Sequence, residues 1–271
     1  MKKIFITLST LCVFLASCTK EHKRPGKGWH EITYLYAHGL ADTQAQADNY
    51  QGVLFEGPVY TFDFPDATTQ FWRVNFTKTS LGQRPEIEHL KNKLDDRLER
   101  DPEAKFVGIG VSRGAATWLN LMGSYAPEEV KALVLESPPD SMETAIGAGL
   151  HPFVPGIFME YDTKGEQPRD TVHSIPKDLP ILIICTKEDH LVPYASTIEL
   201  YRLLKEEHPN VHILVFESGR HAKFVLGKHR QTYRNVAHAF YKKYGLPYDK
   251  QAAKAGKKLF SATQPKPEEL Q

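Results

Sequence analysis

The chain has 271 residues, of which 41% are hydrophobic and 25% are charged, so it holds enough apolar material for one globular domain with a large core. Its formal net charge is only +1, which gives no reason to expect a nucleic-acid-binding protein. We find no internal repeat.

The first residues are typical of an export signal. Met1-Lys2-Lys3 is basic, and the apolar run over residues 4–16 is too short to cross a bilayer as a permanent helix. The run ends in Leu15-Ala16-Ser17-Cys18, which resembles the lipobox of bacterial lipoproteins. This resemblance implies a signal peptide over residues 1–17 and a lipidated Cys18, with the protein held at the periplasmic or cell-surface face of a membrane. An ordinary cleavage site with an incidental cysteine is the alternative.

Residues 18–28 then follow as a polar, flexible tether between the lipid and the domain. Of the three cysteines, Cys12 would be lost with the signal and Cys18 would be lipidated. Cys185 remains, inside an apolar run, so we expect no internal disulfide and a small buried core side chain at this position.

Apolar runs that alternate with helical patterns predict an α/β fold. We expect an open, mostly parallel, doubly wound sheet with helices on both faces. The predicted strands cover residues 32–37, 59–64, 106–111, 132–135, 181–185 and 211–216. The predicted helices cover residues 85–100, 112–124, 193–207 and 224–244.

The predicted catalytic domain spans residues 29–248. Two segments interrupt its alternation, residues 65–84 and residues 138–178, and the second contains six prolines. That second segment is long enough to form a short cap insertion over the site, or it is a surface insertion without such a role. Residues 249–271 are rich in Lys, Gln and Pro, and we expect a peripheral polar C-terminal tail there.

One serine occurs in a setting typical of an activated nucleophile. Ser112 lies in Gly110-Val111-Ser112-Arg113-Gly114, between a predicted strand and a predicted helix. A very tight turn at this point holds the serine in a strained backbone conformation with its hydroxyl exposed. Glycines two positions to either side are needed because the strand and the helix nearly touch.

Two further side chains follow late strands. Asp189 comes after the strand over residues 181–185, and His221 comes after the strand over residues 211–216. Because the reactive groups of a parallel sheet gather at the carboxyl ends of its strands, we expect both residues near Ser112. A serine hydroxyl needs a base to remove its proton and a carboxylate to orient that base, and His221 and Asp189 supply these groups.

At this point the chain resembles the α/β-hydrolase fold family over most of residues 30–245. The order of nucleophile, acid and histidine is that of the family. The resemblance implies that Ser112 is the nucleophile, His221 the general base and Asp189 the orienting acid. The family also commonly has His-Gly after an early strand, here His38-Gly39. By this resemblance the backbone amides of Leu40 and Arg113 would form the oxyanion hole.

For several of these roles the sequence offers alternative residues. Glu136 ends the strand over residues 132–135, and Glu188 is adjacent to Asp189, so either could replace Asp189 as the acid. His229 and His238 are better explained as surface or packing residues than as the base. Asp63 is more simply a structural residue, and His38 more simply shapes the oxyanion loop than transfers a proton. Phe71, Trp72, Phe153 and Phe158 could line an acyl pocket, although core packing is the simpler interpretation.

Arg113 departs from the small or apolar residue that many relatives carry after the nucleophile. Its guanidinium could bind an anionic substrate or pair with a nearby carboxylate. We predict a serine hydrolase, esterase-like or lipase-like, that acts on a small-molecule or lipid acyl substrate through an acyl-enzyme, with no cofactor and no metal. A peptidase or acyltransferase on the same triad, or a binding lipoprotein without turnover, is the alternative.

Overall fold

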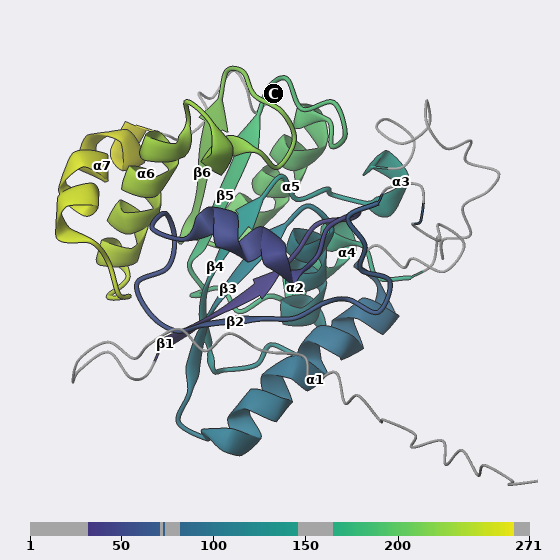
Figure 1. Ribbon diagram of the computed structural model, residues 1–271. Helices are drawn as coiled ribbons and strands as arrows, with labels where there is room; N and C mark the ends of the chain where they lie inside the picture. Colours follow the sequence, from purple (N-terminus) through teal and green to yellow (C-terminus); the bar gives the residue numbers. More distant parts are fainter. Residues whose placement is uncertain (1–31, 71–72, 74–81, 146–164, 263–271) are drawn as a thin grey trace, which may run out of the picture.

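The computed structural model describes residues 32–70, 73, 82–145 and 165–262 (Figure 1). Six strands form one sheet in the order β2-β1-β3-β4-β5-β6, and every pair of neighbours is parallel. The strands are β1 (Ile32–Ala37), β2 (Val59–Thr61), β3 (Lys105–Val111), β4 (Val130–Glu136), β5 (Ile181–Thr186) and β6 (Val211–Phe216). The predicted fold class, an open parallel sheet with helices on both faces, is confirmed.

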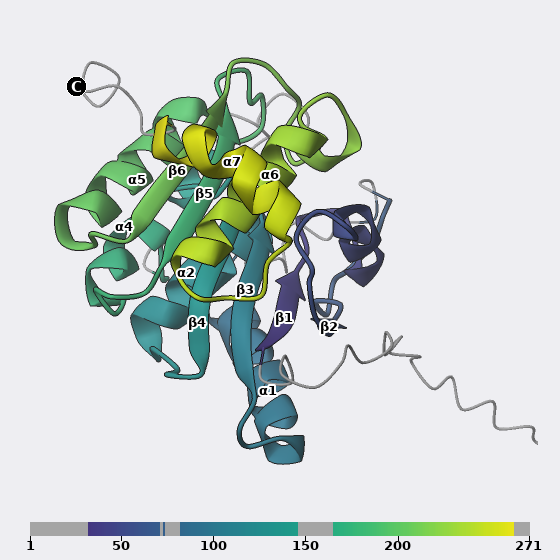
Figure 2. The same cartoon turned by 90° about the vertical axis from the view of Figure 1, so that its left-hand side faces the viewer.

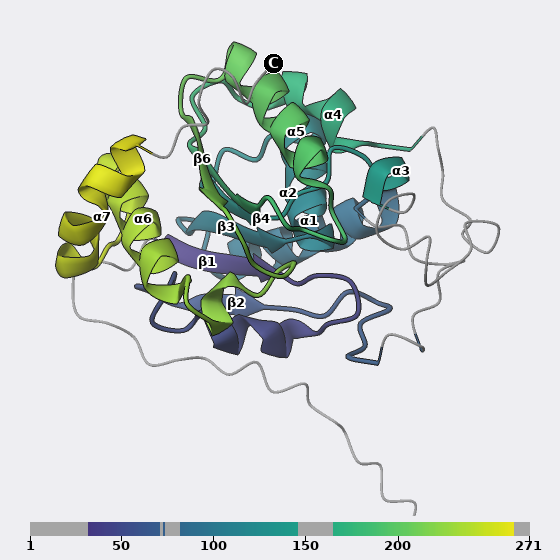
Figure 3. The same cartoon turned by 90° about the horizontal axis from the view of Figure 1, so that it is seen from above.

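Helices cover the two faces of the sheet separately (Figure 3). One face carries α1 (Arg84–Arg100), α2 (Arg113–Ser124) and α5 (Tyr194–Glu207), together with the short α4 (Pro168–Thr171) and η5 (Val172–Ser174). The other face carries η1 (Gln44–Tyr50), η6 (Phe224–Leu226) and α6 (Arg230–Lys243). The remaining helices are α3 (Met142–Ala145) and α7 (Lys250–Ala262).

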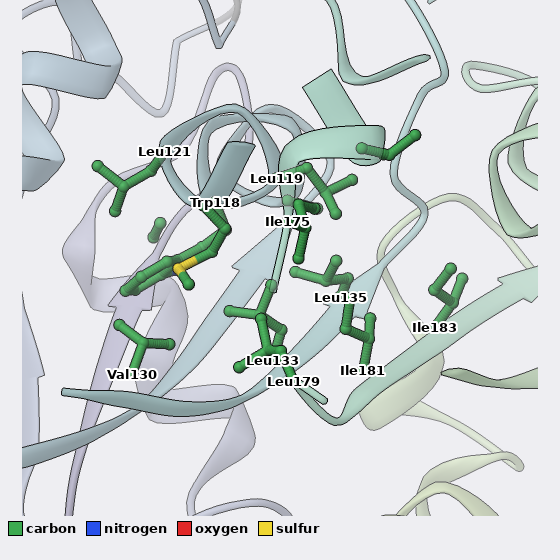
Figure 4. Packing of buried hydrophobic residues seen from close by; sticks show 14 of the residues in the cluster. Trp118, Leu119, Leu121, Val130, Leu133, Leu135, Ile175, Leu179, Ile181 and Ile183 are labelled. Atoms are coloured by element: carbon green, nitrogen blue, oxygen red, sulfur yellow. The ribbon is translucent and has the colours of Figure 1, made fainter. Parts of the chain in front are cut away.

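Each face of the sheet has its own hydrophobic cluster. Trp118 of α2 lies over β3 and β4, packed with leucines and isoleucines of the neighbouring strands (Figure 4). Its indole N–H donates to the carbonyl of Ile109 at 3.1 Å, so the largest core side chain is also satisfied as a donor. Because β3 is buried on both faces, its sequence is a continuous apolar run without polar alternation.

The strand order places a topological switch point between β1 and β3. The chain leaves β1 for β2 at the edge of the sheet and then returns to β3 on the other side of β1. The segment after β1 leads to η1 on one face, whereas α2 follows β3 on the other face. Such a switch point is where open α/β sheets place their ligands, beyond the carboxyl ends of the strands.

Asn120 of α2 holds the ends of the two segments that interrupt the alternation. Its buried side-chain amide donates to the carbonyl of Gly82 at 2.9 Å and to the carbonyl of Glu166 at 3.3 Å. Its oxygen accepts a hydrogen bond from the hydroxyl of Thr171 at 2.7 Å. A later described part of each segment, residues 65–84 and 138–178, is therefore fixed to the helix that follows the candidate nucleophile.

The structure differs from the sequence prediction at the last helix. Residues 224–244 were predicted as one helix, but Phe224–Leu226 is a 3-10 turn and α6 begins at Arg230. Gly227 between them is extended, with φ −140° and ψ −151°. The break lets Phe224 and Val225 bury their side chains against the sheet, which a straight helix would carry away from it.

The prediction of a polar tail over residues 249–271 is wrong for the first half of this range. Residues 250–262 form α7, which packs on α6. Gly256 permits this packing, since a Cβ there would overlap the carbonyl oxygen of Asn235. Asp249 begins the helix by accepting the N–H of Ala252 at 2.7 Å, and Phe260 packs near its end on Phe240. The domain therefore extends to residue 262.

Candidate active site

The turn after β3 has the strain that the sequence predicts for Ser112. Its backbone has φ 50° and ψ −110°, outside the regions that L residues ordinarily adopt. A Cβ on Gly110 would lie 2.7 Å from the backbone of Ala115, and one on Gly114 would overlap the carbonyl oxygen of Ala37. At Gly110 the end of β3 touches the helix that follows it, and at Gly114 that helix touches the end of β1, so no side chain fits at either position.

Asp189 and His221 are joined directly. The Nδ1 of His221 lies 2.8 Å from Oδ2 and 3.0 Å from Oδ1 of Asp189. The side chain of His221 is 9% exposed and that of Asp189 is 2% exposed, so little water competes for the contact. Burial alone would raise the pKa of the Asp189 carboxyl, but hydrogen bonds from His221 and from the amides of Val192 and Leu191 hold the pKa below its ordinary value.

Ser137 is a further contact that sequence reasoning missed. It follows β4, is fully buried, and its hydroxyl donates to Oδ2 of Asp189 at 3.0 Å. Its backbone N–H donates to the carbonyl of Ile184, and its φ is 49°. The signal in the sequence is a polar residue directly after a buried strand, but its spacing of 52 residues from Asp189 does not predict the contact.

Ser112 and His221 lie at the carboxyl edge of the same sheet, at the ends of β3 and β6. Within the described residues no hydrogen bond joins the Ser112 hydroxyl to the His221 ring. Because Nδ1 faces Asp189, Nε2 is the ring nitrogen left to act as a base toward a serine. Nucleophile and base contacts are often long without substrate and tighten when it binds.

The His38-Gly39 loop lies beside the nucleophile. A Cβ on Gly39 would be 3.8 Å from the Cβ of Ser112. The Nε2 of His38 accepts the backbone N–H of Phe64 at 3.1 Å, so the ring proton is on Nδ1, which donates to the carbonyl of Gly39 at 2.8 Å. Burial, reinforced by the charge of Arg113, lowers the pKa of His38 to about 4. His38 is therefore a neutral ring that holds the loop.

Arg113 is buried and paired. Its side chain is 1% exposed, and its Nη1 lies 2.7 Å from Asp66 and 3.2 Å from Glu86. The guanidinium also covers the Phe64 ring at 4.5 Å and reaches the carbonyl of Gly39 at 3.4 Å. This geometry favours the pairing that the sequence left open over the binding of an anionic substrate. Arg113 joins the loop after β1 to the segment after β2 and to α1.

The rival acids face other groups. The carboxyl of Glu136 accepts a hydrogen bond from the hydroxyl of Tyr50 at 2.8 Å, on the α6 side of the sheet. Burial raises the pKa of Glu136 to about 7. The carboxyl of Glu188 accepts the N–H of Gly219 at 3.4 Å. Of the three carboxylates, it is that of Asp189 which contacts the ring of His221.

The other residues singled out by the sequence have structural contacts. His229 stacks on Phe216 with ring centroids 4.1 Å apart, and His238 is buried, accepting the N–H of Asp249. Asp63 accepts the N–H of Gln44 at 2.6 Å. Cys185 is buried in β5, where burial raises the pKa of its thiol.

Backbone strain is concentrated at this edge. Within the described residues, five positions other than glycine have positive φ, and one of them, Ala126, lies in the turn before β4. The other four are Ser112 itself, Ser137, and the residues that follow Leu40 and His221, namely Ala41 and Ala222. Strain that the fold sustains at one place is a mark of a functional site.

Some predicted features lie outside the described residues. These are the signal peptide over residues 1–17, Cys18 and the tether over residues 18–28, and the four aromatic residues Phe71, Trp72, Phe153 and Phe158. In the part that is described, no helix is long and apolar enough to span a bilayer. The same part holds no group of three His, Cys, Asp or Glu side chains suited to a metal ion.

Comparison with solved structures identifies the fold. A Pyrococcus furiosus esterase superposes with a TM-score of 0.63 at 22% identity, covering 79% of this chain and 83% of its own. A Pyrococcus horikoshii acylaminoacyl peptidase gives 0.65 at 16% identity, covering 84% of this chain and 39% of its own. The chain has the α/β-hydrolase fold. A Paleococcus ferrophilus monoacylglycerol lipase matches this α/β-hydrolase fold with a TM-score of 0.54 at 16% identity, covering 82% and 97%.

Sequence comparison gives less information about this chain than the comparison of structures does. No family model matches the chain. The uncharacterized protein YfhR of Escherichia coli K12 is 25% identical over 206 residues, which cover 74% of this chain and 67% of YfhR. The assignment of Ser112, Asp189 and His221 therefore depends on the geometry described above.

Proposed function

We propose that this chain is a serine hydrolase that cleaves a carboxylic ester or a related acyl bond. The observation that carries the proposal is the strained Ser112 at the head of α2, on the same edge of the sheet as the buried Asp189–His221 pair. The fold supports it, because its solved relatives include an esterase, a peptidase and a lipase.

The proposed reaction proceeds in two halves. Nε2 of His221 takes the proton of Ser112 as its Oγ attacks the acyl carbon, and Asp189 stabilises the imidazolium that forms. The backbone amides of Leu40 and Arg113 donate to the oxyanion. The attack forms a tetrahedral intermediate that carries this oxyanion. When the intermediate collapses, the bond to the leaving group breaks, and the leaving group receives the proton from His221. Water then attacks the acyl-enzyme by the same steps and releases the acid.

Labelling with a serine-reactive fluorophosphonate tests the mechanism. The wild type should label at Ser112, and the variants Ser112→Ala and His221→Ala should not. Equal labelling of wild type and Ser112→Ala, or no labelling of either, would refute the proposal. With one activated acyl donor, a comparison of water, alcohols and amines as acceptors separates hydrolysis from acyl transfer, and a chain-length series of esters defines the acyl group.

We further propose that the chain is exported and anchored through a lipid on Cys18. The support is the basic start, the apolar run over residues 4–16 and the lipobox-like Leu15-Ala16-Ser17-Cys18. Radiolabelled palmitate should enter the wild-type chain in bacteria and should not enter Cys18→Ala. Equal incorporation in both would show that the anchor is elsewhere.

A further inference from the structure

Positive charge is concentrated in one part of the fold. Between Arg230 and Ala262 there are eight Lys and Arg residues and one acidic residue, Asp249, so this segment has a net charge of +7. The whole chain is +1, and the rest of it is therefore −6. The segment comprises α6, α7 and their connection, and we name it the basic hairpin.

The lysines of α7 share one side of the helix. Lys250, Lys254, Lys257 and Lys258 follow one another at helical spacing, and all four are exposed. The opposite side, with Ala252, Ala253 and Gly256, is buried toward α6. The four amino groups therefore form a stripe that faces away from the protein.

Some other cations of the described residues are paired with a carboxylate, whereas the α7 lysines are not. Elsewhere Lys91 pairs with Asp95 at 2.5 Å, and Arg202 pairs with Glu199 at 2.8 Å. None of the four α7 lysines forms an ion pair with a described carboxylate, and α7 has no acidic residue in its sequence. Like charges at i and i+4, as at Lys250 and Lys254, destabilise a helix. Fold stability therefore does not account for the stripe.

The basic hairpin lies beside the start of the described chain. The hydroxyl of Tyr34 on β1 donates to the carbonyl of Pro247 in the connection between α6 and α7. The beginning of β1 and that connection lie side by side in Figures 1 and 2. The sequence preceding β1 adds further cations, since residues 19–31 contain four Lys and Arg residues and two Glu residues. The described chain therefore begins beside the basic hairpin, and the sequence that precedes it is also basic.

We propose that the basic hairpin docks on an anionic lipid surface, with the lysine stripe of α7 toward the headgroups. Cations near such a surface each strengthen binding by about fivefold. A membrane fits better than another polyanion because the connection between α6 and α7 lies beside the start of β1, and the sequence before β1 leads to the proposed anchor. The proposal is independent of the hydrolase chemistry.

The test uses a polarity-sensitive dye on the full-length chain. Cys12 and Cys18 are replaced by Ala, and the dye is attached at Gln251→Cys, which is exposed between the lysines. The matched control carries the dye at Ser124→Cys, exposed at the end of α2 on the other face of the sheet. Phosphatidylglycerol vesicles are compared with phosphatidylcholine vesicles, so that any binding by the apolar residues 4–16 is common to both.

Docking predicts a blue shift of the dye at position 251 on phosphatidylglycerol vesicles, absent on phosphatidylcholine and reversed by about 0.5 M salt. Replacing the four α7 lysines by Gln should abolish the shift, with circular dichroism unchanged. An equal shift at position 124, or a shift that survives the Gln substitutions, would overturn the proposal. So would a response to duplex DNA but not to vesicles, which would assign the stripe to nucleic acid.

Discussion

The carboxyl of Glu136 is fully buried at the end of β4, and burial raises its pKa from 4.5 to about 7. The folded state therefore holds this proton more tightly than the unfolded state does. Each pKa unit corresponds to about 1.4 kcal/mol, so ionisation of Glu136 costs the folded protein about 3 kcal/mol. This cost is absent below pH 4.5, grows as the pH rises toward 7, and is complete above pH 7.

Glu136→Gln removes the titration and keeps an oxygen that accepts the hydrogen bond from the Tyr50 hydroxyl. We expect the free energy of unfolding of the variant, relative to wild type, to rise by about 3 kcal/mol between pH 4.5 and pH 8.5. Urea unfolding at a series of pH values measures this difference. Glu128→Gln, an exposed carboxyl in the turn before β4, is the control and should show no such change.

Parallel pH profiles for wild type and Glu136→Gln would refute the reasoning that burial sets this pKa. The same variant tests Glu136 as the rival acid of the triad. Because the ring of His221 contacts Asp189, ester hydrolysis by Glu136→Gln at pH 6 should stay within about threefold of wild type. A loss of a thousandfold would transfer the role of acid to Glu136.

Four further substitutions test other contacts. Asp189→Asn should lower kcat by roughly a thousandfold or more, since it removes the charge that faces the His221 imidazolium; near-normal turnover would exclude it as the acid. Ser137→Ala removes one donor to Asp189 and should lower kcat about tenfold with KM unchanged; a change in KM alone would contradict this. Arg113→Ala should lower the free energy of unfolding by roughly 3–5 kcal/mol, because Asp66 and Glu86 stay close together without the guanidinium, and urea unfolding decides it. Gly256→Ala should cost roughly 1–3 kcal/mol by forcing α7 off α6, and an unchanged melting temperature would show that the helices separate freely.

The strands were predictable where burial on both faces makes the sequence uniformly apolar. The central strand β1 and the edge strand β6 begin and end at the predicted residues, and each end of β3, β4 and β5 lies within two residues of the prediction. The second predicted strand was too long, because Phe62 and Phe64 are buried without continuing β2. η1 was not predicted, because its polar sequence shows no helical periodicity. Its one large buried side chain, Tyr50, is its last residue and so forms no apolar pattern.

The site was predictable to the extent that parallel strands bring their carboxyl ends together. This reasoning predicted that Asp189 orients His221, and the structure joins their side chains, while their catalytic roles stay predictions. The contact of Ser137 with Asp189 requires a left-handed backbone at a serine, which no local pattern indicates. The pairing of Arg113 could be named as an option, but which carboxylates it meets depends on the path of the chain after β2.

The hydrogen bonds of Asn120 allow the two segments to change in sequence without moving the candidate nucleophile. Because they hold Gly82, Glu166 and Thr171 on α2, each of the segments 65–84 and 138–178 is attached to the scaffold in its later part. A loop that is closed at fixed points can differ in length at little entropic cost. Residues in these segments can therefore diversify, or be exchanged by design, while Ser112 at the head of the same helix keeps its place.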